Sequence, residues 1–286
     1  MQKSYKTQQK IVNVLLESIP FIRAFREETI VIKYGGAAQL NPELKESFAL
    51  DLVLMYMVGI RPVVVHGGGK RIDEMLSKLQ IESHFLDGYR VTSKECMQVV
   101  EMVLSGEINK EITAFLNLHG AHAVGISGKD GLTLSAQAKD NGKFGYTGEI
   151  TKVDTKLLEK ILSEGFIPII APIASGEDST GYNINADIAA CEIAKALRAS
   201  KVMFLSDIPG VLDEHRQLIS SLTPSSIESL RQSGVISGGM IPKLEACVGC
   251  VRNGVKKAHI IDGRIEHSLL LELFTKEGIG TQIVRD

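Results

Sequence analysis

The chain has 286 residues, of which 44% are hydrophobic and 23% charged, and its formal net charge is -2. A chain of this length can build a large core or two lobes, but its balanced charge excludes a protein that attracts nucleic acid through an overall positive field. It contains no run of about 18 apolar residues and begins with a polar segment, so we expect a cytoplasmic protein that does not enter a membrane.

Residues 1–28 form a separate segment. Its apolar residues fall near helical spacing: Ile11, Val14, Leu15, Ile19 and Ile22. This pattern predicts an amphipathic helix, which Pro20 is expected to end or kink. Two arrangements stay open for such an arm, packing against its own domain or docking on another subunit.

Six short runs rich in Val and Ile follow, most of them succeeded by a turn and then by a helical pattern. They predict strands at 29–33, 62–66, 121–127, 166–172, 202–206 and 258–261. This alternation predicts an α/β fold with an open, mainly parallel central sheet between helices. Residues 142–150 are rich in glycine and predict a hairpin, and the polar segment 175–181 predicts a lobe boundary or a loop that borders a site.

Two of the strands run into glycine turns, which contain Gly35 and Gly36 in the first case and 67–69 in the second, and the first strand carries Lys33 near its end. Glycines at these places let backbone N–H groups approach an anion, so phosphate is the expected guest. The turns match neither a P-loop nor a dinucleotide-binding Gly-x-Gly-x-x-Gly pattern. A tight strand-to-helix turn without a ligand stays the structural alternative.

Three further charged residues have both a functional and a structural interpretation. Arg90 follows a glycine turn, where its guanidinium is suited to a carboxylate. Asp187 stands in the first turn of a predicted helix with Asn185 as N-cap, so capping alone would explain it. Lys243 follows the glycines at 238–239, although a solvated surface lysine is the default for such a position.

The four cysteines are too few for a disulfide scaffold and suit a reducing compartment. Cys247 and Cys250 have the spacing of metal ligands, but no second pair of cysteines or histidines lies near them in the sequence. We therefore expect two half-buried thiols on a helix and no metal held by the protein.

Taken together and in order, six motifs resemble the amino acid kinase family, and within it the members that phosphorylate N-acetyl-L-glutamate. The motifs are Lys33-Tyr34-Gly35-Gly36, Val65-His66-Gly67-Gly68-Gly69, Gly88-Tyr89-Arg90-Val91-Thr92, Asn183-Ile184-Asn185-Ala186-Asp187, Leu205-Ser206-Asp207-Ile208-Pro209-Gly210-Val211 and Gly238-Gly239-Met240-Ile241-Pro242-Lys243. The resemblance covers residues 30–286 and departs from the family at Ala37-Ala38-Gln39. It implies an oligomerisation arm at 1–28, an N-lobe at 29–175 for acetylglutamate binding and dimerisation, and a C-lobe at 176–286 for ATP binding and arginine regulation.

The resemblance implies transfer of the ATP γ-phosphoryl group to the side-chain carboxylate of N-acetyl-L-glutamate, a step of arginine biosynthesis, with Mg²⁺ on the ATP phosphates. A carboxyl group with a pKa of about 4.3 is already ionised near neutral pH, so this reaction needs positioning and charge stabilisation but no general base. In the family pattern, Lys33 and Lys243 flank the transferring group and Asp187 holds both lysines.

The same resemblance assigns the binding residues. Backbone N–H groups for the acceptor and the γ-phosphate come from the glycine turns: Gly35, Gly36, Gly67 and Gly68. Arg90 and Asn183 hold the far end of the acetylglutamate, and the adenosine lies along 205–211, which includes Ser206, Asp207, Gly210 and Val211.

Members that L-arginine inhibits have an N-terminal helix like 8–25 and a C-terminal segment like 267–281. The resemblance therefore implies arginine feedback, with Glu272 for the cationic end of arginine and Gly278 and Gly280 for its carboxylate. It also implies a hexamer of dimers joined through the arms, and a PII nitrogen-signalling protein is a further candidate partner. Two alternatives stay open, a sister kinase of the carbamate, uridylate or aspartate type and a sensor that has lost turnover.

Overall fold

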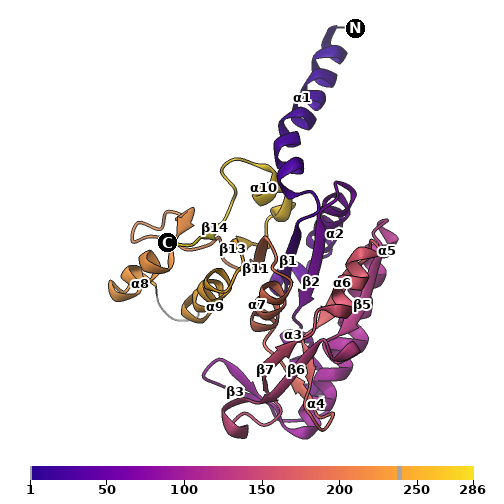
Figure 1. Ribbon diagram of the computed structural model, residues 1–286, viewed down its shortest axis with the longest axis vertical. Coiled ribbons are helices and arrows are strands. Elements are labelled where there is room, and N and C mark those ends of the chain that lie inside the picture. The colour runs from indigo at the N-terminus through magenta and orange to yellow at the C-terminus, as the bar shows by residue number, and fades with distance from the viewer. Residues whose placement is uncertain (1, 237–239) are drawn as a thin grey trace.

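The computed structural model describes residues 2–236 and 240–286, and within them an eight-stranded sheet forms the centre of the molecule (Figure 1). Its strands in spatial order are β12 (Ser221–Leu222), β14 (Thr281–Ile283), β13 (Lys257–Asp262), β11 (Lys201–Ser206), β1 (Thr29–Tyr34), β2 (Arg61–His66), β8 (Ile167–Ala171) and β5 (Ala123–Ser127). All neighbours are parallel except β13 and β14. The predicted α/β class, the mainly parallel sheet and the six strands are confirmed.

The central strands are buried on both faces, which explains their runs of β-branched residues. On β1, Ile30 and Ile32 face one helical layer and Val31 faces the other, as the two-residue period of a strand requires. β1 pairs with β2 so that Lys33 lies opposite Val65. The two glycine turns therefore leave the sheet side by side, at the carboxyl ends of parallel strands where ligands of such sheets bind.

Helices cover both faces of the sheet. One face carries α2 (Pro42–Met57), α5 (Asn109–Leu118) and α10 (Ser268–Phe274), and the other carries α6 (Lys156–Ser163), α7 (Ala186–Ala196) and α9 (Met240–Arg252). A third apolar cluster joins α3 (Gly69–Lys78), α4 (Lys94–Glu101) and the π-helix η2 (Met102–Ile108). Apart from the N-terminal arm, the remaining described helices are α8 (Pro224–Gln232) and the short 3-10 turns η1 (Gly36–Gln39), η3 (Asp130–Leu132) and η4 (Lys139–Gly142).

Two smaller sheets lie beside the main one. The first has the order β10 (Gly181–Asn183), β9 (Ile173–Ser175), β6 (Leu134–Ala138) and β7 (Gly148–Val153), and the second is the hairpin of β3 (His84–Leu86) and β4 (Tyr89–Val91). The prediction of a hairpin at 142–150 is wrong, because β7 pairs with β6 and the glycine-rich stretch 139–147 only connects them. β6 lacks β-branched residues, so its pattern does not indicate a strand. The predicted lobe boundary at 175/176 falls between β9 and β10, which pair antiparallel.

The arm is one helix, α1 (Gln2–Phe25), which stands out from the body (Figure 1). Contrary to expectation, it does not end at Pro20. The carbonyl that a proline leaves without its helical partner lies here on an exposed helix, where water can pair with it. Apolar side chains along the arm stay exposed, among them Val14 at 66% and Leu15 at 62%. Along most of the arm, its own domain therefore does not cover these side chains.

None of the helices in the described part of the chain has the length and hydrophobicity to cross a bilayer. Cys247 and Cys250 lie on α9 as predicted, but both are fully buried free thiols and not half-buried ones. No group of three or more His, Cys, Asp or Glu side chains in residues 2–236 and 240–286 is placed to hold a metal ion.

Candidate active site

A cleft of about 360 Å³ opens at the carboxyl ends of β1 and β2. Predicted site residues from four separate motifs line it: Lys33, Gly35, Gly36, Gly67, Gly68, Arg90, Asn183 and Asp187. The volume is suited to a small ligand, and the lining combines cations, glycine backbone and a few aromatic side chains.

Two lysines meet at one carboxylate beside this cleft. Lys33 comes from β1 and its Nζ lies 3.1 Å from Asp187 Oδ1, while Lys243 comes from α9 and its Nζ lies 3.7 Å from Asp187 Oδ2. Each lysine side chain is only 16% exposed, so Lys243 is not the solvated surface residue of the default interpretation. Two ammonium groups and one carboxylate leave an excess of one positive charge, which favours an anionic ligand.

The sequence places Asp187 in this position through a helix start. Asn185 is the N-cap of α7, and its side chain accepts hydrogen bonds from the backbone of Asp187 and Ile188. Burial opposes ionisation of Asp187, but the charges of Lys33 and Lys243 outweigh it, so the pKa of the carboxyl lies below its usual value. Since Asn185 performs the capping, the Asp187 side chain is free to hold the lysines.

α9 begins at Met240. The double glycine predicted before Lys243, at 237–239 with its preceding serine, lies outside the described residues.

The two glycine turns differ in what their backbone can offer. The N–H of Gly67 donates to the carbonyl of Tyr34 at 2.9 Å and so extends the pairing of β1 with β2. This N–H is therefore not free to bind a ligand. Gly68 is the N-cap residue of α3, where the first N–H groups have no partner within the helix. Gly36 has φ of +68°, and a Cβ there would lie 2.5 Å from Asp207 Oδ1, so only glycine fits this turn.

Arg90 and Asn183 both line the cleft, Arg90 from β4 and Asn183 from β10. The Arg90 guanidinium is 6% exposed at the residue level and donates to Asp73 Oδ1 and Ser83 Oγ, both at 2.6 Å. It also stacks over Phe85, with 4.6 Å from Cζ to the ring centroid. A carboxylate of the protein already engages one edge of this guanidinium.

The structure adds cleft residues that the sequence did not single out. Leu40, Phe85 and Tyr89 supply apolar and aromatic surface, and Gln39 supplies a side-chain amide. Gln39 is the last residue of the segment in which the family resemblance breaks down. The sequence did contain a signal for Tyr89, because this residue directly precedes Arg90 in one of the six motifs.

The predicted adenosine segment divides into two parts. Ser206 is the last residue of β11, next to β1, and Asp207 follows it and approaches Gly36. Val211 is buried, and its N–H donates to Thr281 Oγ1 at 2.8 Å, beside Gly210. Neither part is among the residues that line the cleft, so the structure brings Asp207 close to Gly36 without making this segment part of the same cavity.

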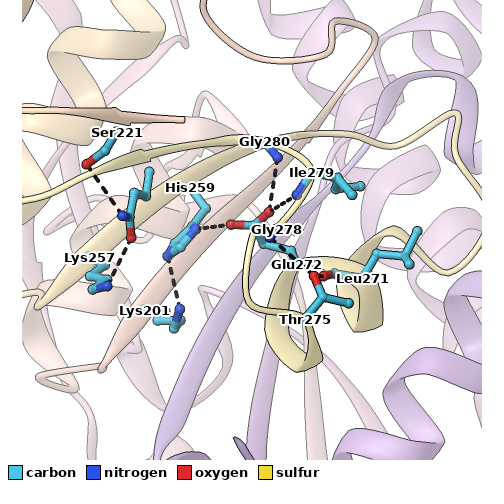
Figure 2. A network of polar contacts seen from close by, with 11 residues as sticks. Lys201, Ser221, Lys257, His259, Leu271, Glu272, Thr275, Gly278, Ile279 and Gly280 are labelled. Carbon is cyan, nitrogen blue, oxygen red and sulfur yellow. Dashed lines mark hydrogen bonds and ion pairs between the residues drawn. The ribbon is translucent and has the colours of Figure 1, made fainter. Parts of the chain in front are cut away.

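A second polar cluster surrounds the predicted arginine residues (Figure 2). Glu272 Oε1 accepts from His259 Nδ1 at 2.6 Å, and its Oε2 accepts the N–H groups of Ile279 and Gly280 at 2.7 and 3.0 Å. The Gly278 N–H donates to Thr275 Oγ1. Both glycine N–H groups and the carboxylate that the resemblance assigns to arginine are thus engaged within the chain.

The same cluster reaches the base of the arm. Lys201 Nζ lies 3.2 Å from His259 Nε2 and 4.9 Å from the centroid of Phe25, the last residue of α1. Burial, with the charge of Lys257 nearby, lowers the pKa of Lys201 to about 8. Burial also lowers the pKa of His259, so we treat it as a neutral ring that donates from Nδ1 to an ionised Glu272.

Comparisons with known proteins agree with this geometry. The sequence pattern described as "Amino acid kinase family" matches residues 28–262. Acetylglutamate kinase from Helicobacter hepaticus is 70% identical over 274 residues, which are 95% of this chain and 98% of that protein. Acetylglutamate kinase from Wolinella succinogenes is 62% identical over 279 residues, 97% of this chain and 98% of that protein.

Two solved structures extend the comparison. N-acetylglutamate synthase from Neisseria gonorrhoeae, complexed with coenzyme A and N-acetyl-glutamate, has a TM-score of 0.86 at 27% identity; the match covers 96% of this chain but 63% of the synthase chain. Carbamate kinase from Giardia lamblia bound to AMP-PNP shares the fold, with a TM-score of 0.68 at 18% identity over 91% of this chain and 99% of that one. The chain belongs to the amino acid kinase family, and within it to the acetylglutamate kinases.

Proposed function

We propose that this chain transfers the γ-phosphoryl group of ATP to the side-chain carboxylate of N-acetyl-L-glutamate, a step of arginine biosynthesis. The observation that carries the proposal is the meeting of Lys33 and Lys243 on Asp187 beside a glycine-lined cleft. Relatives named acetylglutamate kinase, at 54–70% identity, supply the acceptor.

In the proposed reaction a carboxylate oxygen attacks the γ-phosphorus, and the bond from that phosphorus to the β,γ-bridging oxygen breaks. The products are N-acetyl-L-glutamyl 5-phosphate and ADP. Two anions must approach each other, so cations that lie between them lower the barrier. Lys33 acts from the acceptor side and Lys243 from the nucleotide side, and Asp187 fixes both ammonium groups in place without neutralising them fully.

Substrate contacts follow from the cleft. The Gly68 N–H and the turn at Gly35–Gly36 are proposed to face the transferring phosphoryl group, since glycine lets backbone approach an anion. Arg90 is proposed to bind the α-carboxylate, in which case the substrate competes with Asp73 for the guanidinium, and Asn183 to bind the acetamido end. Ser206, Asp207, Gly210 and Val211 are proposed to lie along the nucleotide.

Mg²⁺ is proposed to enter with ATP. Among the described residues that line the cleft, Asp187 is the one acid, and its carboxylate faces two ammonium groups at 3.1 and 3.7 Å, which does not suit a metal ligand. Mg²⁺ commonly keeps several waters and binds substrate phosphates, where it supplies charge neutralisation. The protein contribution to its binding is therefore the placement of the phosphates.

The direct test traps the acyl phosphate. Purified protein is incubated with ATP, Mg²⁺, hydroxylamine and one of four acceptors: N-acetyl-L-glutamate, L-glutamate, L-aspartate or carbamate. We expect hydroxamate and ADP in equal amounts with N-acetyl-L-glutamate alone. Equal turnover with aspartate or carbamate would favour a sister kinase, and nucleotide binding without turnover would favour a sensor.

We also propose inhibition by L-arginine at the cluster of Glu272, Gly278 and Gly280. Supporting observations are a buried carboxylate that could take a guanidinium and its link through His259 and Lys201 to Phe25 at the base of the arm. Because these groups are engaged with one another, arginine must displace the 275–280 segment to reach them. The exposed apolar arm supports assembly of dimers into a hexamer, and the four buried free thiols support a cytoplasmic location.

Deletion of residues 1–24 tests this regulation. We expect a smaller oligomer by light scattering and weaker inhibition by arginine, with turnover retained. Unchanged oligomer size together with unchanged inhibition would contradict both parts of the proposal.

A further inference from the structure

One buried histidine is not explained by the chemistry above. His66 is the last residue of β2 and is 0% exposed, directly before the glycine turn. Its Nδ1 lies 3.0 Å from the carbonyl oxygen of Gly67, and its Nε2 lies 3.2 Å from Nδ2 of Asn109, the first residue of α5. Asn109 is also 0% exposed.

The contacts of Asn109 determine the direction of its amide. Its Nδ2, which carries two hydrogens, faces three acceptors, the carbonyls of Ile126 and Ile169 at 3.1 and 2.8 Å and His66 Nε2, so one hydrogen is shared; its Oδ1 accepts from Lys110 Nζ at 3.1 Å. Rotation of the amide by 180° would turn Oδ1 toward two carbonyl oxygens, which repel it. The nitrogen of this amide therefore faces His66 Nε2.

The histidine tautomer follows from its two neighbours. With the proton on Nδ1, the Nε2 lone pair of His66 faces the amide hydrogen of Asn109 that is shared with a carbonyl, and Nδ1–H donates to the Gly67 carbonyl, so both contacts are favourable. With the proton on Nε2, two donors would meet at one end of the ring and two acceptors at the other. Burial lowers the pKa of His66 to about 4, which keeps the ring neutral at the pH of the cytoplasm.

The Gly67 carbonyl is held from a second direction as well. Gln39 Nε2 donates to this oxygen at 3.2 Å and to the Tyr34 carbonyl at 3.1 Å. In a planar trans peptide the N–H points away from the C=O of the same unit. His66 Nδ1 and Gln39 Nε2 thus fix the direction of the Gly67 carbonyl, and with it the opposite direction of the Gly68 N–H, on a residue that lines the cleft.

Side chains from the π-helix close a third side of this peptide. A Cβ at Gly68 would lie 2.7 Å from Leu104 Cδ2 and even nearer to Ile108 Cδ1. Asn109 follows Ile108 directly, so the end of the π-helix supplies both the packing and the amide. π-Helical turns are rare and are frequent at functional sites.

We infer that His66 is a positioning residue for phosphoryl transfer: Asn109 sets its tautomer, and its Nδ1–H holds the Gly67 carbonyl so that the Gly68 N–H points at the transferring group. This inference rests on the proposed function. His66 itself contacts no substrate; it acts through one peptide unit. Loss of its Nδ1–H should therefore weaken transition-state binding more than substrate binding.

A matched pair of variants tests this role. In His66→Asn the side-chain nitrogen reaches the place of Nδ1 and can still donate to Gly67, whereas in His66→Gln the amide reaches the place of Nε2 and that donor is lost. We expect His66→Gln to lower kcat by about 10- to 100-fold, with the KM values for ATP and acetylglutamate within about threefold of wild type. His66→Asn should recover most of this kcat, although both variants lose the ring and should have similarly lowered Tm. Equal kcat values in the two variants would overturn the inference.

A spectroscopic measurement decides the tautomer independently of activity. In wild-type protein labelled with ¹⁵N-histidine, long-range ¹H–¹⁵N correlation distinguishes Nδ1–H from Nε2–H rings. The His66 signals are assigned by their loss in His66→Asn or, if that variant does not fold, by through-space contact with the Asn109 amide. We expect a neutral Nδ1–H ring at pH 7; an Nε2–H ring would overturn the inference. A wild-type protein without acetylglutamate turnover would contradict the proposed function instead, and the tautomer would still be measured.

Discussion

Two acids, Asp187 and Glu272, show how differently the chain treats its charges. Asp187 faces two ammonium groups, and its side chain is 23% exposed toward the cleft. Glu272 is 7% exposed, and both its oxygens accept hydrogen bonds from the chain itself. The first arrangement leaves a positive excess ready for an anion, whereas the second is closed until something displaces its own donors. The proposed catalytic region is therefore preformed, and the proposed regulatory region must open.

The largest expected effect comes from the preformed side. Lys33→Met keeps the length of the side chain but removes its charge, so kcat should fall by about 10²- to 10³-fold while Tm changes little. Steady-state kinetics and thermal unfolding on the same samples measure both quantities. Lys160→Met is the control, because Lys160 is 71% exposed and pairs only with Glu164. If Lys33→Met kept near wild-type kcat, Lys33 would have no part in the mechanism.

At Glu272, whose oxygens are bound within the chain, we expect a substitution to affect stability more than turnover. Glu272→Gln places an amide N–H₂ against N–H groups that donate hydrogen bonds to the Glu272 carboxylate in the wild type. This repulsion should lower the free energy of unfolding by about 1–3 kcal/mol. Chemical denaturation measures this loss, and the same variant should respond less to arginine. Glu164→Gln, on an exposed surface pair, is the matched control. Unchanged stability would mean that the network around Glu272 is not closed in solution.

Asp51 connects helix α2 to the start of the helix that carries Glu272. It lies on α2, and its carboxylate contacts His267 Nδ1 at 2.7 Å and the Leu269 N–H at 3.2 Å, at the start of the helix that carries Glu272. Burial, partly offset by His267, raises the pKa of Asp51 to about 6 from 3.8. A carboxyl whose pKa is raised on folding contributes stability below pH 3.8, and this contribution is lost as the pH rises through about 6.

The stability of the wild type relative to Asp51→Asn should therefore decline between pH 4 and pH 7, because asparagine does not titrate. Urea unfolding of both proteins at several pH values measures the difference. A difference that stayed constant over this range, or that grew with pH, would contradict the raised pKa.

The smallest effect belongs to the exposed surface. Loss of the Lys160–Glu164 pair in Lys160→Met should change the free energy of unfolding by no more than about 0.5 kcal/mol. The measurement is the same denaturation experiment. A larger loss would show that an exposed ion pair contributes more to the stability of this protein than we expect.

Much of the fold could be predicted because buried parallel strands have a distinctive composition. The β-branched runs at β1 and β2 indicated both strands, whereas β6 lacks such residues and was missed. The helix through Pro20 was missed because local sequence does not show that the freed carbonyl is exposed to water. Local patterns thus predict buried elements better than exposed or irregular ones.

The site was predictable by residue type but not by hydrogen bonding. The order of the motifs predicted that Lys33 and Lys243 meet at Asp187, and in the structure they do. No pattern could show that the Gly67 N–H is already used by Tyr34, or that Asp73 already binds Arg90, because these contacts depend on strand register and on tertiary packing. The role inferred for His66 has the same origin, since Asn109 is distant in sequence.

The most direct test of the central claim is a single-turnover measurement of phosphoryl transfer from ATP to N-acetyl-L-glutamate by the wild type, Lys33→Met and Lys243→Met. With saturating substrates, we expect stoichiometric acyl phosphate in the wild type and rates lower by about 10²-fold or more in each variant, without loss of ATP binding. Transfer at the wild-type rate in either variant would contradict the claim that both lysines stabilise the transferring group.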